Sequence, residues 1–108
     1  MSIPTHLDNA RQRMARWRLL RILYSGLPYP VGETLILEVL NDADLAMTVT
    51  QVRSGLRYLA DKGYVDVKDV TVRHEGTHLE ARLLPKGVDF VEYSVPDEDP
   101  GVARPDPV

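Results

Sequence analysis

The sequence predicts a small α+β domain that is mainly α, with three helices, a two-stranded hairpin and a short last helix. Three observations support this prediction. Apolar residues recur at helical spacing in three segments, a capping signal opens the third segment, and an alternating pattern follows its end. The 108 residues suit a single domain, and 44% hydrophobic residues can build one modest core.

The first helix is expected to begin at Asp8 or Asn9, because either side chain can cap it, and to end at Tyr24 or Ser25, before Gly26. Residues 1–7 are therefore predicted to form an N-terminal arm that precedes the domain. The apolar stripe of this helix recurs at helical spacing and consists of Ala10, Met14, Trp17, Leu20 and Tyr24.

Extra apolar residues widen the stripe near the C-terminal end of this helix, at Leu19, Ile22 and Leu23. A wide apolar surface indicates contact with more than one neighbour, and a small core makes association with a second copy unsurprising. We therefore expect a homodimer that forms through helix one. The contacts predicted for it are Met14, Trp17 and Leu20, with the core as the alternative place for Trp17.

A second helix is predicted over roughly Gly32–Asn41, because the two prolines of Leu27–Pro30 cannot continue the first. A third helix begins after Thr48, which forms a capping box with Gln51, and ends at Gly63. The apolar residues of this third helix fall on one side and are Val49, Val52, Leu56 and Leu59.

The hairpin is expected to pair Tyr64–Val72 with His78–Leu84 around a tip at Glu75–Gly76. Pro85 can open the last helix, which should reach Tyr93, because proline is tolerated in a first turn. From Val95 onward the chain is rich in proline and acidic residues. The predicted organisation is a domain over residues 8–94 and a disordered tail over residues 95–108.

Charge and composition narrow the possible functions. The net charge is −3, but residues 9–26 hold five arginines and no acid, whereas the acidic tail leaves residues 1–94 close to neutral. The absence of cysteine excludes disulfides and thiolate metal sites. No signal peptide or membrane span is visible, so we expect a cytoplasmic protein with no membrane contact.

Helix, turn, helix and hairpin in this order are typical of a winged helix-turn-helix. The segment Leu56–Val65 resembles the end of the recognition helix and the start of the wing in bacterial regulators of the ArsR, MarR and PadR type, and Leu84–Gly87 is similar to the step that follows their wing. The whole chain also resembles small ArsR-annotated winged-helix proteins of Mu-like phages and prophages. This resemblance implies a DNA-binding regulator of transcription or a DNA-handling factor.

The predicted DNA-binding residues lie on the side of helix three opposite its apolar stripe and on the hairpin. Hydroxyl, amide and guanidinium groups on such a helix can reach base edges and phosphates in a major groove, and basic residues of the wing can steady the complex. An ordinary solvated surface is the alternative interpretation of these side chains. The candidates are Thr50, Gln51, Arg53, Ser54, Arg57, Tyr58, Lys68 and Arg73.

One feature argues against DNA binding. Helix two and its turn carry no basic residue, and their carboxylates would repel phosphates. These carboxylates belong to Glu33, Glu38, Asp42 and Asp44. The alternative function is therefore a non-catalytic interaction or assembly module in phage particle production. We expect no enzyme activity, cofactor or small-molecule ligand, because no phosphate loop or nucleophile elbow is present. His74 and His78 lack a third ligand, so no metal site is expected.

Overall fold

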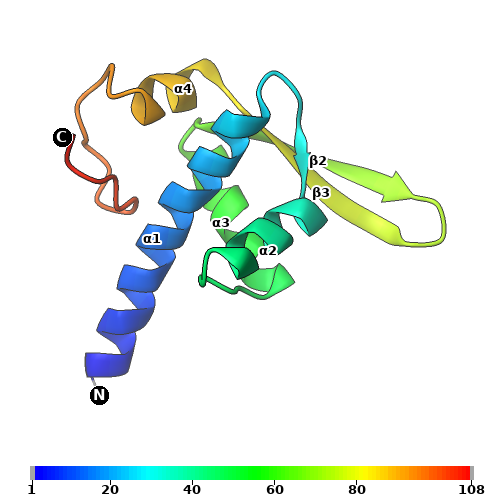
Figure 1. Ribbon diagram of the computed structural model, residues 1–108, viewed down its shortest axis with the longest axis horizontal. Coiled ribbons are helices and arrows are strands. Elements are labelled where there is room, and N and C mark those ends of the chain that lie inside the picture. Colours follow the sequence, from blue (N-terminus) through cyan, green and yellow to red (C-terminus); the bar gives the residue numbers. More distant parts are fainter. Residues whose placement is uncertain (1, 108) are drawn as a thin grey trace.

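The computed structural model describes the backbone of residues 2–107 and the side chains of residues 7–107. Within this described part of the chain, four helices and three strands form one winged helix-turn-helix, in which the helices pack together and a hairpin extends beyond them (Figure 1). The elements, in chain order, are α1 (Ser2–Gly26), β1 (Val31–Gly32), α2 (Glu33–Asp42), α3 (Val49–Asp61), β2 (Val65–Val72), β3 (Gly76–Leu83) and α4 (Pro85–Val91).

Helix α1 begins earlier than predicted, at Ser2, so the expected N-terminal arm is helical over most of its length. Asp8 and Asn9 lie within the helix instead of capping it. A residue that favours capping does not stop a helix when the residues before it can also adopt helical geometry. Pro4 permits this extension because the first four N–H groups of a helix have no partner within it.

The helix-turn-helix begins and ends where the sequence predicts. The Thr48 side chain accepts from the Gln51 amide at 3.1 Å, and the Gln51 side chain accepts from the Thr48 amide at 2.9 Å, so the capping box is present. Gly63, with φ +82°, supplies the left-handed residue after α3. The predicted inward stripe of α3 is buried except for Val49, which is 41% exposed because the first turn extends past the edge of the core.

Over residues 2–107 the sheet has three strands, whereas the sequence predicts two. β2 and β3 form the hairpin, in register from Val65 opposite Leu83 to Val72 opposite Gly76. The short strand β1 pairs antiparallel with the other edge of β3, which gives the order β1-β3-β2. Two residues are too few to show an alternating pattern, so only the tertiary pairing reveals β1.

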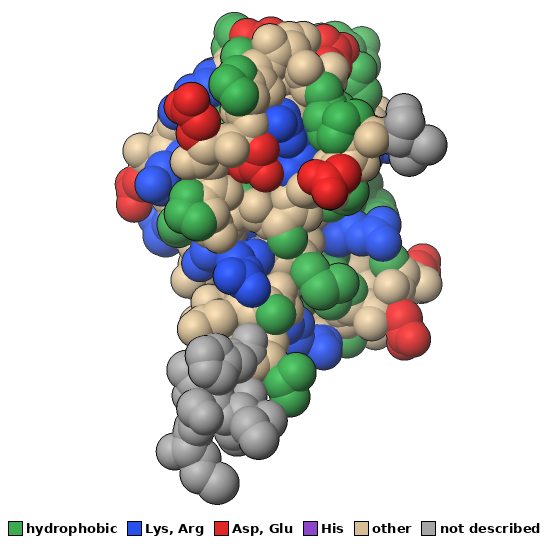
Figure 2. Space-filling model, turned by 90° about the vertical axis from the view of Figure 1, so that its left-hand side faces the viewer, with side chains coloured by type: hydrophobic (Ala, Val, Ile, Leu, Met, Phe, Trp, Pro, Cys, Tyr) green, Lys and Arg blue, Asp and Glu red, His purple; other side chains and the backbone are tan. Residues whose placement is uncertain are grey.

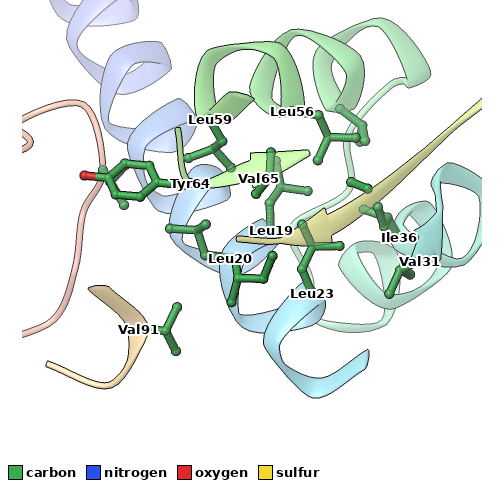
Figure 3. Close-up of a cluster of buried hydrophobic side chains, with 14 of the residues drawn as sticks. Leu19, Leu20, Leu23, Val31, Ile36, Leu56, Leu59, Tyr64, Val65 and Val91 are labelled. Carbon is green, nitrogen blue, oxygen red and sulfur yellow. The ribbon is translucent and has the colours of Figure 1, made fainter. Parts of the chain in front are cut away.

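The core lies between α1, α3 and the base of the sheet, with α2 and α4 closing it on either side (Figures 1 and 3). Leu20 is fully buried in this core, so the prediction that it contacts a partner subunit is wrong. Trp17 packs edge-on against Phe90 and Tyr93 of the same chain, at ring distances of 6.2 Å. Of the predicted dimer contacts, only Met14 lies exposed on the surface.

The C-terminal segment folds back along α1 and α4, which differs from the expected disorder (Figure 1). Asp99 and Val102 are buried, and the Ala103 amide donates to the Arg13 carbonyl at 3.1 Å. Its composition gives no local apolar repeat, so the contacts that order it come from residues distant in sequence. No helix among residues 2–107 is long and apolar enough to cross a membrane.

Candidate nucleic-acid interface

The outer side of α3 forms one wall of a shallow open depression beside α1. Most of the predicted DNA-binding residues of α3 line this depression, because the capping box and Gly63 set where the helix begins and ends and the buried stripe sets which side faces outward. The residues that line it are Arg16, Thr50, Arg53, Ser54, Arg57, Tyr58 and Asp61.

Arg53 is engaged within the protein. Its Nε and Nη2 atoms each donate to one carboxylate oxygen of Glu33, both at 2.7 Å, and Glu33 is almost fully buried. The paired hydrogen bonds from Arg53 hold the pKa of Glu33 below its usual range, although burial opposes this. Nδ1 of His78 lies 3.1 Å from the same carboxylate. The cluster therefore joins α2, α3 and β3, and Arg53 is a positioning residue of this surface.

Tyr58 is also engaged. Its hydroxyl donates to Oδ1 of Asp99 at 2.8 Å, and the guanidinium of Arg16 lies 3.8 Å from the centre of its ring. Burial, followed by the hydrogen bond to the Asp99 carboxylate, raises the pKa of Tyr58 above the usual tyrosine value. The C-terminal segment therefore occupies the end of the outer face at which Tyr58 lies.

The remaining groups of the face are accessible. Thr50, Ser54 and Arg57 are exposed, whereas Gln51 is exposed but uses its side-chain oxygen in the capping box. Among the residues that the structure describes, Arg57 has no carboxylate within ion-pair distance. One guanidinium and two hydroxyls thus face solvent together along α3.

Arg16 belongs to this surface but was not among the predicted site residues. The sequence signal was the run of arginines on helix one, which by itself does not distinguish one arginine from another. The fold separates them, because Arg16 faces α3 whereas the Arg11 guanidinium donates to the Ala46 carbonyl at 2.9 Å. Arg16 also donates to the Gly101 carbonyl at 3.0 Å.

The structure does not bring the predicted wing residues onto the α3 face. Successive residues of a strand point to opposite faces of a sheet. Val67 packs against the core, so its neighbour Lys68 projects from the other face of β2, where its register partner is Glu80. Arg73 is exposed at the hairpin tip, which extends away from the helices (Figure 1).

Acidic groups border the same region. On the β2 side of Arg57, a second depression contains Asp61, Asp66 and Asp69. Of the helix-two acids, Glu33 is neutralised by Arg53, whereas the other three, Glu38, Asp42 and Asp44, are exposed. On the side of the molecule that carries α1 and the C-terminal segment, acidic side chains gather above and basic ones across the middle (Figure 2).

The two histidines of the hairpin do not converge. His78 contacts Glu33 and the Glu75 carbonyl, while His74 lies exposed in the turn with a positive φ of 71°. Within residues 7–107, no group of three His, Asp or Glu side chains is placed to hold a metal ion.

A comparison with solved structures bears on the fold of this chain. No family model matches the sequence, and no curated protein matches it. An X-ray structure of a PadR-like transcription factor from Bacteroides fragilis superposes with a TM-score of 0.65 and 15% sequence identity. The match covers 87% of this chain and 85% of that one. The chain thus shares the winged-helix fold of that protein, in agreement with the fold expected from the sequence.

Proposed function

We propose that this protein binds double-stranded DNA and acts as a transcriptional regulator or DNA-handling factor. The observation that carries the proposal is the solvent-facing row of Thr50, Ser54 and Arg57 on a capped helix of a winged helix-turn-helix. The sequence resemblance to winged-helix proteins of Mu-like phages supports a prophage setting, and DNA as the partner implies a cytoplasmic protein. No cofactor or catalytic step is part of the proposal.

In this proposal α3 enters a major groove with its outer side toward the bases. Thr50 and Ser54 face base edges, and Arg57 contacts a phosphate or a guanine. Arg53 aligns α3 against α2 through Glu33 and leaves little charge for DNA. Arg16 is placed to meet the phosphate backbone beside α3, and Arg73 and Lys68 can approach DNA only if it also follows the hairpin.

Replacing Arg57 with alanine tests the interface. Loss of one phosphate contact should weaken duplex binding and reduce the slope of log affinity against log salt by about one unit. The measurement is a titration of labelled genomic or prophage duplex at several salt concentrations. Arg82→Ala is the matched control, because Arg82 is equally charged and exposed but lies on the face of β3 that is turned away from the core. Equal slopes for both variants would remove Arg57 from the interface.

The acidic depression favours a second candidate, a non-catalytic interaction or assembly module in phage particle production. Asp61, Asp66 and Asp69 line a depression that Arg57 borders, and they would repel a phosphate backbone that entered it. This candidate predicts that the protein binds duplex no more tightly than the non-specific range of about 10⁻⁴ to 10⁻⁶ M at physiological salt. A saturable, salt-sensitive complex of sub-micromolar affinity would contradict it.

We also propose a homodimer, now assigned to the exposed apolar residues of α1 and α2 rather than to Trp17 and Leu20. Met14 is 52% exposed and Leu35 is 58% exposed, although both are large apolar side chains. Leu35 and Val39 border an apolar hollow between α1 and α2. A second copy that covered these side chains would remove apolar surface from water.

A further inference from the structure

Residues 96–105, termed here the strap, run from the end of α4 across α1 and the C-terminal end of α3. Asp99 and Val102 are its buried residues, at 7% and 3% exposure. Arg16 donates to the Gly101 carbonyl at 3.0 Å, and Tyr58 donates to Asp99 at 2.8 Å. The strap therefore holds both the guanidinium and the phenol at this end of the depression.

The surface around Tyr58 on which the strap lies, termed here its seat, fits the strap closely. A Cβ at position 101 would overlap the Tyr58 hydroxyl, so only glycine allows this approach. The Gly101 amide also donates to Oδ1 of Asp99 at 2.9 Å, which fixes the carboxylate toward Tyr58. Figure 3 shows Tyr64 directed toward the same segment, and burial together with the Asp99 charge raises the pKa of Tyr64 to about 12.

One carboxylate oxygen in the seat is buried unfavourably. Oδ2 of Asp99 is buried without a hydrogen-bond partner among the described residues. Burial of a carboxylate oxygen without a close donor opposes closure of the strap, although the Tyr64 hydroxyl also interacts with Asp99. At the far end, by contrast, Arg104 donates to the Phe90 and Val95 carbonyls and lies over the Phe90 and Tyr93 rings. The segment at Asp99 can therefore lift while Arg104 holds the strap to α4.

We propose that the strap is an internal competitor of nucleic acid for the Arg16–Tyr58 end of the depression. Asp99 and the exposed Asp97 and Glu98 place carboxylates where a phosphate backbone that followed α3 onto α1 would place its own negative charge. Duplex binding and strap closure then exclude each other, so the closed strap lowers the apparent affinity. This inference rests on the proposed function and adds a means of regulating the same site.

Three full-length variants test the competition. Asp99→Asn removes the carboxylate charge from the seat, and Gly101→Ala forces the strap away from Tyr58 without a change of charge. Both should tighten duplex binding by about tenfold, because loss of one charge-assisted hydrogen bond shifts the open population by that order. Asp106→Asn, which removes the same charge from an exposed position beyond the strap, is the matched control and should change affinity less than twofold.

A second measurement reports on the strap itself. The chain has no cysteine, so Val102→Cys introduces a single thiol at a buried position of nearly unchanged size. Alkylation of this thiol should be slow in the free protein, faster when Asp99→Asn is added, and faster again with saturating duplex. A rate that duplex leaves unchanged, or unchanged affinity in both seat variants, would overturn the proposal while leaving DNA binding intact.

If the proposed function itself is wrong, the same measurements give a different set of results. The strap can then still open more readily in Asp99→Asn, as alkylation would show, but neither the parent protein nor any variant binds duplex. That outcome overturns the competition together with DNA binding. Tight binding by the parent that the seat variants do not improve overturns the competition alone.

Discussion

At the scale of single residues, Glu33 and Arg53 change how the sequence is interpreted. In the sequence, Glu33 argues against DNA binding and Arg53 in favour of it. In the structure the two neutralise each other through paired hydrogen bonds, so Glu33 adds no free carboxylate to α2 and Arg53 adds no unpaired cation to α3. The residues are 20 positions apart, and no local pattern indicates that α2 and α3 cross at this point. The α3 face thus relies on Arg57 and Arg16 for its positive charge.

The Glu33 cluster predicts a pH dependence of stability. Because Arg53 lowers the pKa of Glu33 in the folded state, the stabilisation is complete above the ordinary glutamate pKa and is lost as pH falls through the lowered value. Glu33→Gln should reduce the free energy of unfolding at pH 7 by about 1–2 kcal/mol, since Arg53 is partly exposed. Urea unfolding should show this difference shrinking below about pH 4.3.

Glu38→Gln is the control, because Glu38 is exposed on the same helix. Its free energy of unfolding should remain within about 0.5 kcal/mol of the parent across the range. A difference between Glu33→Gln and the parent that stays constant down to pH 3 would show that the carboxylate does not stabilise the fold through its charge.

At the scale of elements, sequence signals within one segment account for α3, whereas contacts between distant segments decide the extent and pairing of the elements around it. The capping box, the apolar stripe and Gly63 are all read within one segment, and the helix begins and ends where they indicate. Helix α1 extends past its predicted start, because a capping tendency at Asp8 or Asn9 does not oppose helical residues before it. Strand β1 forms only because the edge of β3 is free to pair with it.

The capping box predicts a measurable loss of helix stability. Thr48→Ala removes the acceptor for the Gln51 amide and should lower the free energy of unfolding by about 1 kcal/mol. Urea unfolding at neutral pH measures the loss. Thr50→Ala is the control, because Thr50 is exposed on the first turn but accepts no capping bond, and alanine is the better helix former. Equal stability of the two variants would contradict a role for the cap.

At the scale of the whole molecule, the apolar surfaces that remain exposed differ from those that the apolar stripe of helix one suggested. Three residues of the helix-one stripe were expected to contact a partner subunit, but α4 covers Trp17 and the core encloses Leu20. Met14 and the α2 residues Leu35 and Val39 remain exposed instead. The C-terminal segment likewise covers a surface that was expected to be open. Both differences arise because segments distant in sequence fold over these surfaces, α4 over Trp17 and the C-terminal segment over Arg16 and Tyr58.

The proposed dimer can be tested on this surface. Met14→Glu places a charge among exposed apolar side chains, so it should shift the protein from dimer to monomer in light scattering at micromolar concentration. Gln12→Glu adds the same charge on the side of α1 that faces α3 and should leave the mass unchanged. A parent protein that is already monomeric, or a dimer insensitive to Met14→Glu, would contradict the proposed surface.

The amino-acid pattern alone was enough to establish the winged helix-turn-helix, because its helices, cap and hairpin depend on periodicity and turn residues within short segments. It was also enough to place Thr50, Ser54 and Arg57 on the outer side of α3. Only the folded chain decided which charges remain available, since Arg53 pairs with Glu33, and Tyr58 with Asp99, across long stretches of sequence. Ion pairs and hydrogen bonds between distant segments leave no periodic trace, so tertiary packing alone reveals them.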